Sequence, residues 1–241
     1  MGEGRGQMGN DETKRAAGYA AADRYVSSNM KVGMGTGSTA VWAIRRIGER
    51  LADGSIDNVV GVATSSQAEL ECHELGIPLR SLNDPQIGGR LDLVIDGADE
   101  VDPDRRLVKG GGGALLVEKV VAYNADCVVI VVDESKLVDH LGMAFPVPVE
   151  VLPFARVAVL AALRGLGGDP AVRVAERKMG AVITDNGNLV VDVGFSEPFD
   201  PLAMEAELAM IPGVLGNGLF TRVEPIVVVG HADGSVDELS D

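Results

Sequence analysis

The chain has few cysteines and few cationic side chains for its length. Only Cys72 and Cys127 occur among 241 residues, and each lies within an apolar or helical pattern. This argues against a disulfide framework and favours two buried thiols in a reducing compartment. Lys and Arg number 21 against 36 Asp and Glu, which gives a net charge of −15. Because nucleic-acid binding needs a basic patch to neutralise phosphates, this composition predicts no nucleic-acid partner.

Long apolar segments are also lacking. The longest purely apolar runs, such as 127–132, are far shorter than the roughly 20 residues of a membrane-spanning helix. The first ten residues, MGEGRGQMGN, lack the apolar core of a secretion signal. We therefore expect a soluble cytoplasmic protein that does not bind membranes. With 46% hydrophobic residues, the chain can form one large domain and a smaller companion.

What the sequence does contain is an alternation of helices and apolar strands. We predict helices over 11–28, 39–52, 66–75 and 114–122, and strands over 31–35, 58–64, 77–82, 91–96 and 127–134. This alternation is typical of a parallel sheet with helices on both faces. It predicts an α/β fold with a Rossmann-like, mostly parallel sheet over residues 1–145.

The pattern changes near Pro146, where the segment FPVPVEVLP carries three prolines. A helix over 154–166, strand segments around a turn at 185–188 and a helix over 201–210 then follow. We expect residues 146–215 to form a smaller α+β (ferredoxin-like) lid domain. Residues 216–241 are expected to return to the first sheet.

The segment VGMGTGSTA, residues 32–40, places a glycine loop between a strand and a helix. This arrangement directs backbone N–H groups and the positive end of a helix toward an anion, so it predicts a phosphate site. Thr36, Ser38 and Thr39 add hydroxyl donors. The spacing is not that of a dinucleotide loop, and the lysine of a P-loop is missing. Tight packing between strand and helix remains the alternative reading.

Two further segments carry groups that can transfer protons. Asp96, Asp99, Glu100 and Asp102 follow an apolar strand, where parallel sheets place their sites. Asp96 and Asp99 are candidates for moving protons or binding sugar hydroxyls. A solvated acidic turn is the alternative, and the spacing is not that of a calcium loop.

In LVKGGGGALLVEKVV, Lys109 precedes four glycines and Glu118 lies in the following helix. A glycine run of this kind favours close approach of a ligand to the backbone. Glu118 is a candidate general base, and the alternative is a surface glutamate beside Lys119. Lys136 follows another apolar strand. No zinc-ligand spacing, nucleophilic serine motif or reactive-cysteine motif is present.

Five motifs, GMGTGSTA, TSSQAE, DGADEVD, KGGGGALLVEK and DESKLVDHLG, follow one another in the chain. In this order and spacing the chain resembles ribose-5-phosphate isomerase of the A type. The resemblance implies interconversion of ribose 5-phosphate and ribulose 5-phosphate through an enediolate, in the non-oxidative pentose phosphate pathway. It further implies that the enzyme uses neither metal nor cofactor and forms a homodimer or homotetramer.

The resemblance also implies roles for individual residues. Glu118 is the proton-transferring base, and Asp96, Asp99 and Lys109 are the other catalytic groups. Substrate is bound by Thr36, Gly37, Ser38, Thr39, Asp96, Gly97, Ala98, Asp99, Lys109, Gly110, Gly111, Gly112 and Lys136. Lys14 matches a position that reaches the phosphate. The chain departs from the family pattern at Leu116 and Val117, where Thr–Arg is common.

Two other functions remain as alternatives. A non-catalytic sugar-phosphate sensor would share the glycine loops but is expected to carry a basic helix-turn-helix segment. A methyltransferase has a similar loop but is expected to carry an acid just before it, where this chain has Lys31 and Val32.

Overall fold

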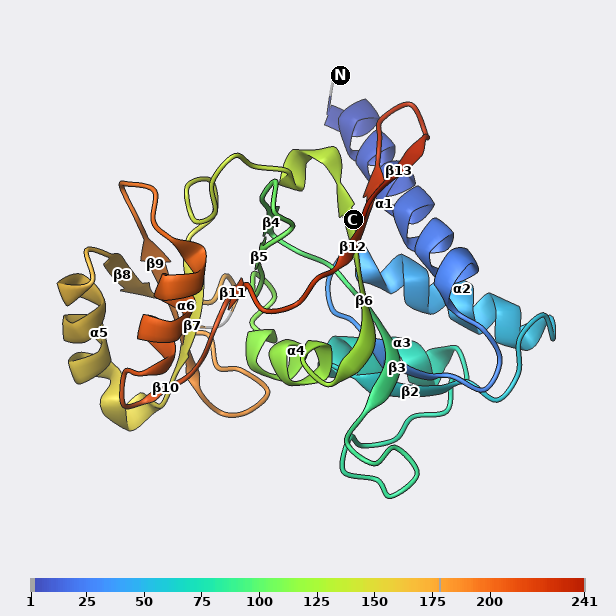
Figure 1. The fold of residues 1–241 in the computed structure, drawn as a ribbon, viewed down its shortest axis with the longest axis horizontal. Coiled ribbons are helices and arrows are strands. Elements are labelled where there is room, and N and C mark those ends of the chain that lie inside the picture. The colour runs from blue at the N-terminus through green and yellow to red at the C-terminus, as the bar shows by residue number, and fades with distance from the viewer. Residues whose placement is uncertain (1–2, 178, 241) are drawn as a thin grey trace. The chain divides into compact units, whose positions relative to one another are not determined.

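The computed structural model describes residues 3–177 and 179–240. The chain divides into two units, which we describe separately (Figure 1). The first unit contains the residues up to Gly97, Val120–Lys136 and the residues from Glu224 on. The second unit contains Ala98–Lys119 and Leu137–Val223.

A six-stranded sheet forms the centre of the first unit, in the order β13-β12-β6-β3-β1-β2. Its strands are β1 (Lys31–Met34), β2 (Val60–Ala63), β3 (Leu91–Asp96), β6 (Ala125–Asp133), β12 (Ile226–Gly230) and β13 (Val236–Leu239). All neighbouring strands are parallel except β13, which pairs antiparallel with β12. The predicted Rossmann-like, mostly parallel sheet is confirmed.

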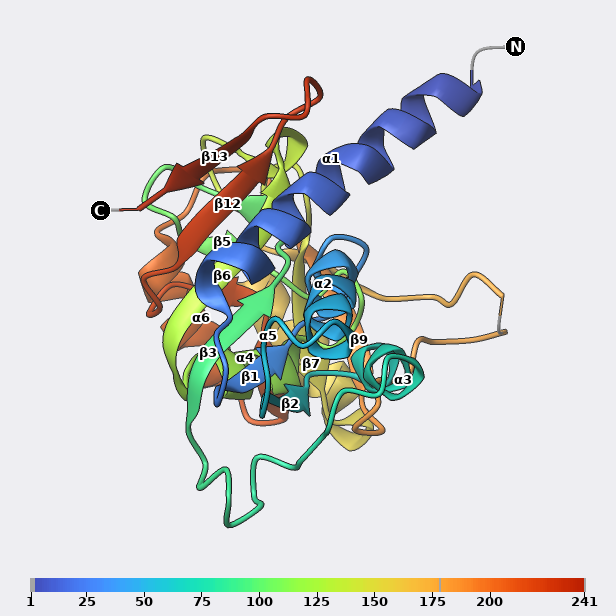
Figure 2. The ribbon, with the colours of Figure 1, turned by 90° about the vertical axis from the view of Figure 1, so that its right-hand side faces the viewer.

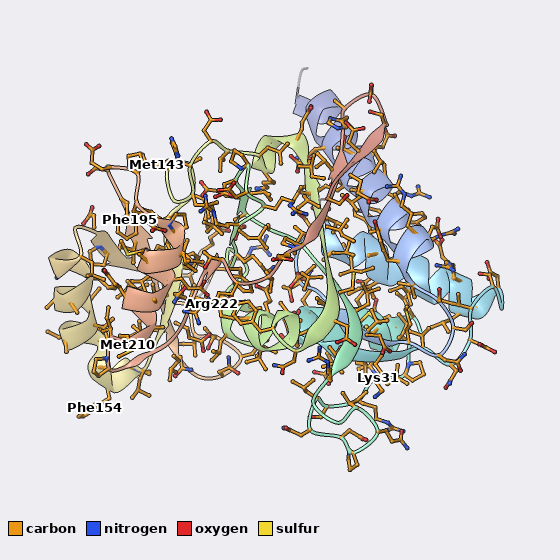
Figure 3. The ribbon with its side chains drawn as sticks, in the orientation of Figure 1. Lys31, Met143, Phe154, Phe195, Met210 and Arg222 are labelled. Carbon is orange, nitrogen blue, oxygen red and sulfur yellow. The ribbon has the colours of Figure 1, made fainter. Side chains whose placement is uncertain are left out.

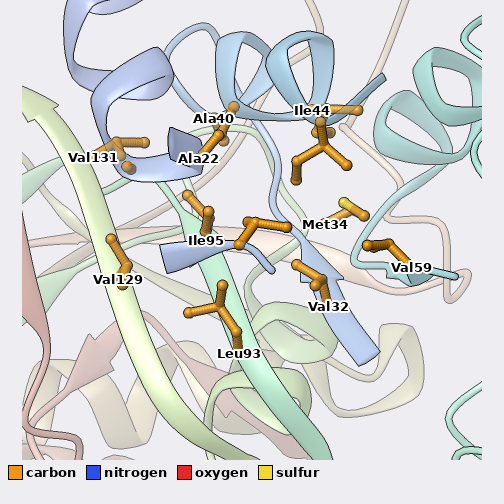
Figure 4. Packing of buried hydrophobic residues seen from close by; sticks show 14 of the residues in the cluster. Ala22, Val32, Met34, Ala40, Ile44, Val59, Leu93, Ile95, Val129 and Val131 are labelled. Atoms are coloured by element: carbon orange, nitrogen blue, oxygen red, sulfur yellow. The ribbon is translucent and has the colours of Figure 1, made fainter. Parts of the chain in front are cut away.

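Helices cover both faces of this sheet. They are α1 (Glu3–Tyr25), α2 (Ala40–Ala52), α3 (Ser66–Glu74) and the end of α4 (Leu115–Ala122), of which only the residues from Val120 on belong to the first unit. The first three share one hydrophobic cluster with strand residues such as Val32, Leu93 and Val129 (Figure 4), and α1 lies next to β6 and β12 (Figure 2). On the opposite face a Cβ at Gly33 would lie 2.6 Å from Cγ1 of Val121 in α4, so only glycine allows this approach. Among the described residues, no helix is long and apolar enough to span a membrane.

Both cysteines are free thiols, as predicted, but only one of them is buried, so the prediction of two buried thiols is wrong for Cys127. Cys72 is buried in α3, and burial raises the pKa of its thiol to about 12. Cys127 in β6 is partly buried, and burial raises the pKa of its thiol as well. Both side chains therefore remain protonated at neutral pH and behave as small apolar groups.

Two predicted elements of the first unit are wrong in extent or type. The first helix begins at Glu3 rather than at residue 11 and ends at Tyr25 rather than at residue 28. Residues 77–82 do not form a strand but a single parallel bridge, in which Gly61 N–H donates to the carbonyl of Pro78 at 2.8 Å. From Ser81 on, polar residues form local turns instead. One example is the hydrogen bond that Asp84 N–H donates to the carbonyl of Ser81.

The second unit contains a four-stranded antiparallel sheet in the order β10-β7-β9-β8. Its elements in chain order are β7 (Val147–Val151), α5 (Arg156–Gly165), β8 (Asp169–Val172), β9 (Leu189–Gly194), α6 (Pro201–Ala209) and β10 (Val214–Asn217). This β-α-β-β-α-β order is that of a ferredoxin-like fold, as predicted. Alternating valines at 147, 149 and 151 pack with Val159 and Leu208 of the two helices.

A small antiparallel sheet also belongs to the second unit. It joins β11 (Leu219–Phe220), β5 (Leu107–Val108) and β4 (Glu100–Val101). The sequence pattern predicts one domain over 1–145, completed by 216–241, and another over 146–215. The units of the structure place 98–119, 137–145 and 216–223 in the second unit, while β12 and β13 pair within the first.

We predict that His231 makes the first unit more stable at mildly acidic pH. Its Nδ1 lies 3.0 Å from Glu134 Oε2 and its Nε2 lies 3.0 Å from Asp237 Oδ2. The hydrogen bond to Glu134 raises the pKa of His231, with a further contribution from Asp237. A raised folded-state pKa stabilises the protein below the ordinary histidine pKa of about 6.5, and this stability is lost as the pH rises through the raised value.

The measurement is the Tm of the wild type and of His231→Gln between pH 5.5 and 8.5. We expect the Tm of the wild type to exceed that of His231→Gln at pH 5.5, and this difference in Tm to decrease as the pH rises. A difference in Tm that is the same at every pH would show that the charge of His231 has no role.

Candidate active site

The loop after β1 is held by the carboxylate of Asp96, the last residue of β3. The backbone N–H groups of Thr36 and Gly97 both donate to Asp96 Oδ1, at 2.9 and 2.8 Å. Asp96 is only 2% exposed. Because β1 and β3 are parallel neighbours, their carboxyl ends meet at one edge of the sheet. The structure therefore brings Asp96 to the glycine loop, where the sequence pattern places it.

Side chains that follow β2 also contact this loop. Thr36 Oγ1 lies 2.7 Å from both Thr64 Oγ1 and Ser65 Oγ. Gly37 N–H donates to Gln67 Oε1 at 3.1 Å. No role was predicted for Thr64, Ser65 and Gln67, although they lie in the TSSQAE motif at the end of an apolar strand. Their position at the end of a strand is the sequence signal that could have identified them. Because β2 is the parallel neighbour of β1, residues that follow the two strands meet at the same edge of the sheet.

A cation reaches the same loop from α1. The Nζ atom of Lys14 donates to Ser38 Oγ at 3.1 Å. Ser38 and Thr39 directly precede α2, whose first turn carries the positive end of the helix dipole. The loop thus combines hydroxyl groups, a helix N-terminus and an ammonium group, which together suit a phosphate.

Lys136 lies at the same edge of the sheet. It ends the short helix η1 (Glu134–Lys136), which begins directly after β6. Strand β6 is the parallel neighbour of β3, so Lys136 follows the strand next to Asp96. Its side chain is half-buried.

In the second unit, Lys109 and Glu118 form a buried ion pair. Lys109 follows β5, Glu118 lies in α4, and Lys109 Nζ is 3.5 Å from Glu118 Oε2. The two residues are 3% and 4% exposed. A cation at this distance favours the ionised carboxylate, which is the form that accepts a proton. The alternative that Glu118 is a surface residue is therefore wrong.

Lys119, the neighbour of Glu118, anchors helix α4. Its Nζ donates to Glu205 Oε1, Asn217 Oδ1 and the carbonyl of Leu219, at 2.7, 3.2 and 2.6 Å. Burial lowers the pKa of Lys119. These contacts tie α4, the helix that carries Glu118, to α6, β10 and β11.

The glycine loop after Lys109 contacts Asp99. Gly111 N–H donates to Asp99 Oδ2 at 2.7 Å, and Asp99 N–H donates to the carbonyl of Val108 at 2.8 Å. Gly110 has a φ of +109°, and a Cβ there would lie 2.9 Å from Leu115, so a larger residue is excluded. Asp99, Lys109 and Gly110–Gly112 thereby belong to one local structure.

The remaining acids of the DGADEVD segment have structural contacts. Glu100 is buried and accepts backbone N–H groups from Gly142, Ala144 and Phe145, at 2.6, 2.9 and 2.6 Å. Asp102 accepts from Arg106 Nε at 2.7 Å. Within the part of the chain that the structure describes, no group of three or more His, Cys, Asp and Glu side chains is arranged to hold a metal ion.

The segment that carries these acids links the two units. Asp96 and Gly97 end the first stretch of the first unit, and Ala98 and Asp99 begin the second unit. The first unit presents hydroxyl, N–H and ammonium groups, which are donors of the kind that a phosphate needs. The second unit presents carboxylate, ammonium and N–H groups, which can bind hydroxyls and transfer protons.

Comparison with known proteins identifies the family. A profile described as ribose 5-phosphate isomerase A (phosphoriboisomerase A) matches residues 60–234. The ribose-5-phosphate isomerase A of Treponema denticola is 44% identical over 239 residues, which cover 96% of this chain and all of that protein. The protein of the same name from Thermosynechococcus vestitus is 50% identical over 220 residues, covering 91% of this chain and 92% of the relative.

Solved structures agree with this result. A D-ribose-5-phosphate isomerase in complex with phospho-erythronic acid has a TM-score of 0.91 and 42% identity, covering 96% of this chain and 99% of that one. Ribose 5-phosphate isomerase A from Methanocaldococcus jannaschii has a TM-score of 0.88 and 42% identity, covering 95% and 98%. The chain therefore belongs to the ribose 5-phosphate isomerase A family.

Proposed function

We propose that the chain interconverts D-ribose 5-phosphate and D-ribulose 5-phosphate through an enediolate, with Glu118 as the base. Membership of the family makes the chain an aldose–ketose isomerase of carbohydrate metabolism. The observation that carries the assignment of Glu118 is its burial beside Lys109, 3.5 Å away. A buried carboxylate with a neighbouring cation suits a proton acceptor whose partner stabilises negative charge on the substrate.

The reaction needs one base and a stabilised oxygen anion. In the open-chain aldose, Glu118 removes the proton from C2, and the electron pair moves onto the C1 carbonyl oxygen to form the enediolate. Lys109 and the N–H groups of the glycine loop stabilise the charge on that oxygen. Glu118 then returns the proton to C1, while O1 gains a proton and O2 loses one, which gives the ketose.

Asp96 and Asp99 serve the proton transfers between oxygen atoms in this proposal. The furanose ring must open before C2 becomes acidic, which moves a proton from the C1 hydroxyl to the ring oxygen. The same carboxylates then exchange protons between O1 and O2. The proposed binding residues are Thr36–Thr39, Asp96–Asp99, Lys109–Gly112 and Lys136. The phosphorylated sugar acid in the solved relative supports a ligand of this class.

The test is conversion of ribose 5-phosphate by the purified protein in excess EDTA and D2O. We expect unchanged activity, and solvent deuterium bound to carbon in the product, because a proton held by Glu118 exchanges with solvent. Activity that the chelator abolishes and a divalent metal restores would contradict the metal-free reaction. A product without deuterium on carbon would show that the transferred hydrogen does not exchange with solvent, and it would contradict the exchangeable proton proposed for Glu118. Sugar phosphate binding without turnover would favour the sensor, which the comparisons do not favour.

We predict that Lys14→Gln raises the KM for ribose 5-phosphate and leaves kcat nearly unchanged. Lys14 contacts Ser38 and brings a positive charge to the proposed phosphate site. The phosphate on C5 of the substrate takes no part in the bond changes at C1 and C2. A charge-assisted hydrogen bond contributes about 1.5–3 kcal/mol, which corresponds to a roughly 10- to 100-fold rise in KM. Steady-state kinetics measures both constants. A fall in kcat with unchanged KM would contradict phosphate binding.

We also propose that the protein is cytoplasmic and forms a homodimer or homotetramer. Phe154 and Met210 of the second unit are 97% and 81% exposed (Figure 3). The two chain segments that carry them lie side by side. Leu152, two residues before Phe154, donates its N–H to the carbonyl of Gly213, three residues after Met210, at 2.9 Å. Large apolar side chains exposed in this way support contact with a second copy of the chain. Sedimentation velocity distinguishes the monomer from both oligomers.

A further inference from the structure

Arg173, the residue after β8, holds the backbone of the glycine loop that follows Lys109. Its Nη1 donates to the carbonyl oxygens of Gly110 and Gly111, each at 2.9 Å. Its Nε and Nη2 donate to the two carboxylate oxygens of Asp192, at 2.8 and 2.5 Å. One guanidinium group therefore joins the loop to the four-stranded sheet of the second unit.

The anchor for this contact is rigid. Asp192 lies in β9, where it pairs with Ala171 of β8. The backbone N–H of Arg173 donates to the carbonyl of Val190 at 2.9 Å, which continues the ladder between the two strands. The side chains of Arg173 and Asp192 are only 16% and 22% exposed. A bidentate arginine–carboxylate pair has a fixed geometry that a lysine cannot reproduce.

The contact determines which way the loop peptides face. In a trans peptide the carbonyl and the N–H point in opposite directions, so carbonyls directed at Arg173 leave their N–H groups directed away from it. The N–H of the Gly110–Gly111 peptide donates to Asp99 Oδ2 at 2.7 Å. A continuous series of hydrogen bonds thus runs from Asp192 through Arg173 and one peptide group to Asp99.

We propose that Arg173 is a positioning residue for the isomerisation, which acts by orienting the Gly110–Gly111 peptide and, through it, the carboxylate of Asp99. This inference rests on the proposed function, in which Asp99 transfers protons between substrate oxygens. Glycine peptides rotate easily, so without Arg173 the loop keeps its sequence but loses this single orientation. Displacements of about 1 Å in a site lower rates by around 10²-fold.

The test is a double-mutant cycle with Arg173→Met and Asp99→Asn, read as kcat and KM. Arg173→Met alone should lower kcat by about 10- to 100-fold, with KM within about threefold of the wild type. If Arg173 acts through Asp99, the double variant should be no slower than Asp99→Asn alone. Additive losses in kcat would overturn the inference, because independent effects on two sites add.

Two controls separate this inference from a general loss of structure and from the proposed function itself. Arg164→Ala removes an exposed arginine of α5 and should leave kcat unchanged. Arg173→Lys keeps the positive charge but cannot make the bidentate contact with Asp192, so its kcat should lie between those of the wild type and Arg173→Met. If Arg173→Met does not fold, Arg173→Lys takes its place in the double-mutant cycle. A wild-type kcat for Asp99→Asn alone would contradict the proton-transfer role of Asp99 in the proposed function, and with it the role of Arg173 that depends on Asp99.

Discussion

Glu118→Gln is expected to lower kcat by about 10²- to 10⁴-fold, with little change in KM. Glutamine has nearly the same shape and can still accept a hydrogen bond, but it cannot take up the proton from C2. The alternative position of this residue on the surface is ruled out by its 4% exposure. Because the substitution removes an interaction used in the transition state, its effect should appear in kcat and in kcat/KM equally. The measurement is steady-state conversion of ribose 5-phosphate at saturating and limiting substrate.

The control for this prediction is Glu118→Asp, which keeps the carboxylate but moves it back by one methylene. Its kcat should lie between those of the wild type and Glu118→Gln. Solvent deuterium exchange into substrate carbon should fall in parallel with kcat, since both depend on the same base. A Glu118→Gln enzyme that isomerises at the wild-type rate would require a different base and would refute the assignment.

Lys109→Met is expected to reduce both activity and stability. Lys109 is 3% exposed and its Nζ lies 3.5 Å from Glu118 Oε2, so the variant removes a buried counter-charge from a buried carboxylate. Loss of one partner of a buried pair costs about 3–5 kcal/mol of unfolding free energy. Loss of the group that stabilises the enediolate oxygen should lower kcat by about 10²- to 10³-fold. Urea unfolding and steady-state kinetics measure the two effects.

The controls for this prediction test the charge of Lys109 and the net charge of the chain separately. Lys109→Arg keeps the charge in a different shape and should retain more activity than Lys109→Met. Arg164→Ala changes the net charge by the same amount at an exposed position. A Lys109→Met enzyme with the kcat and the unfolding free energy of the wild type would contradict both expected effects.

Local patterns in the sequence predicted the architecture well. Continuous apolar segments such as 91–96 and 127–134 became neighbouring parallel strands β3 and β6. The pattern failed at 77–82, where apolar residues alone did not outweigh Pro78 and the polar turn that follows. The short strands β4 and β5 went unpredicted, because two residues carry too little periodicity to identify a strand.

The sequence itself determined the family, the α/β architecture and the residue types of the candidate site. Motifs, glycine loops and strand–helix alternation each depend on residues that are close together in the chain. Only the tertiary structure decided that Glu118 is buried against Lys109 rather than exposed beside Lys119. It also decided that Arg173 donates hydrogen bonds to the carbonyls of Gly110 and Gly111, which lie 63 and 62 residues earlier in the chain. Such contacts depend on how whole sheets pack, and no local pattern of side chains records that packing.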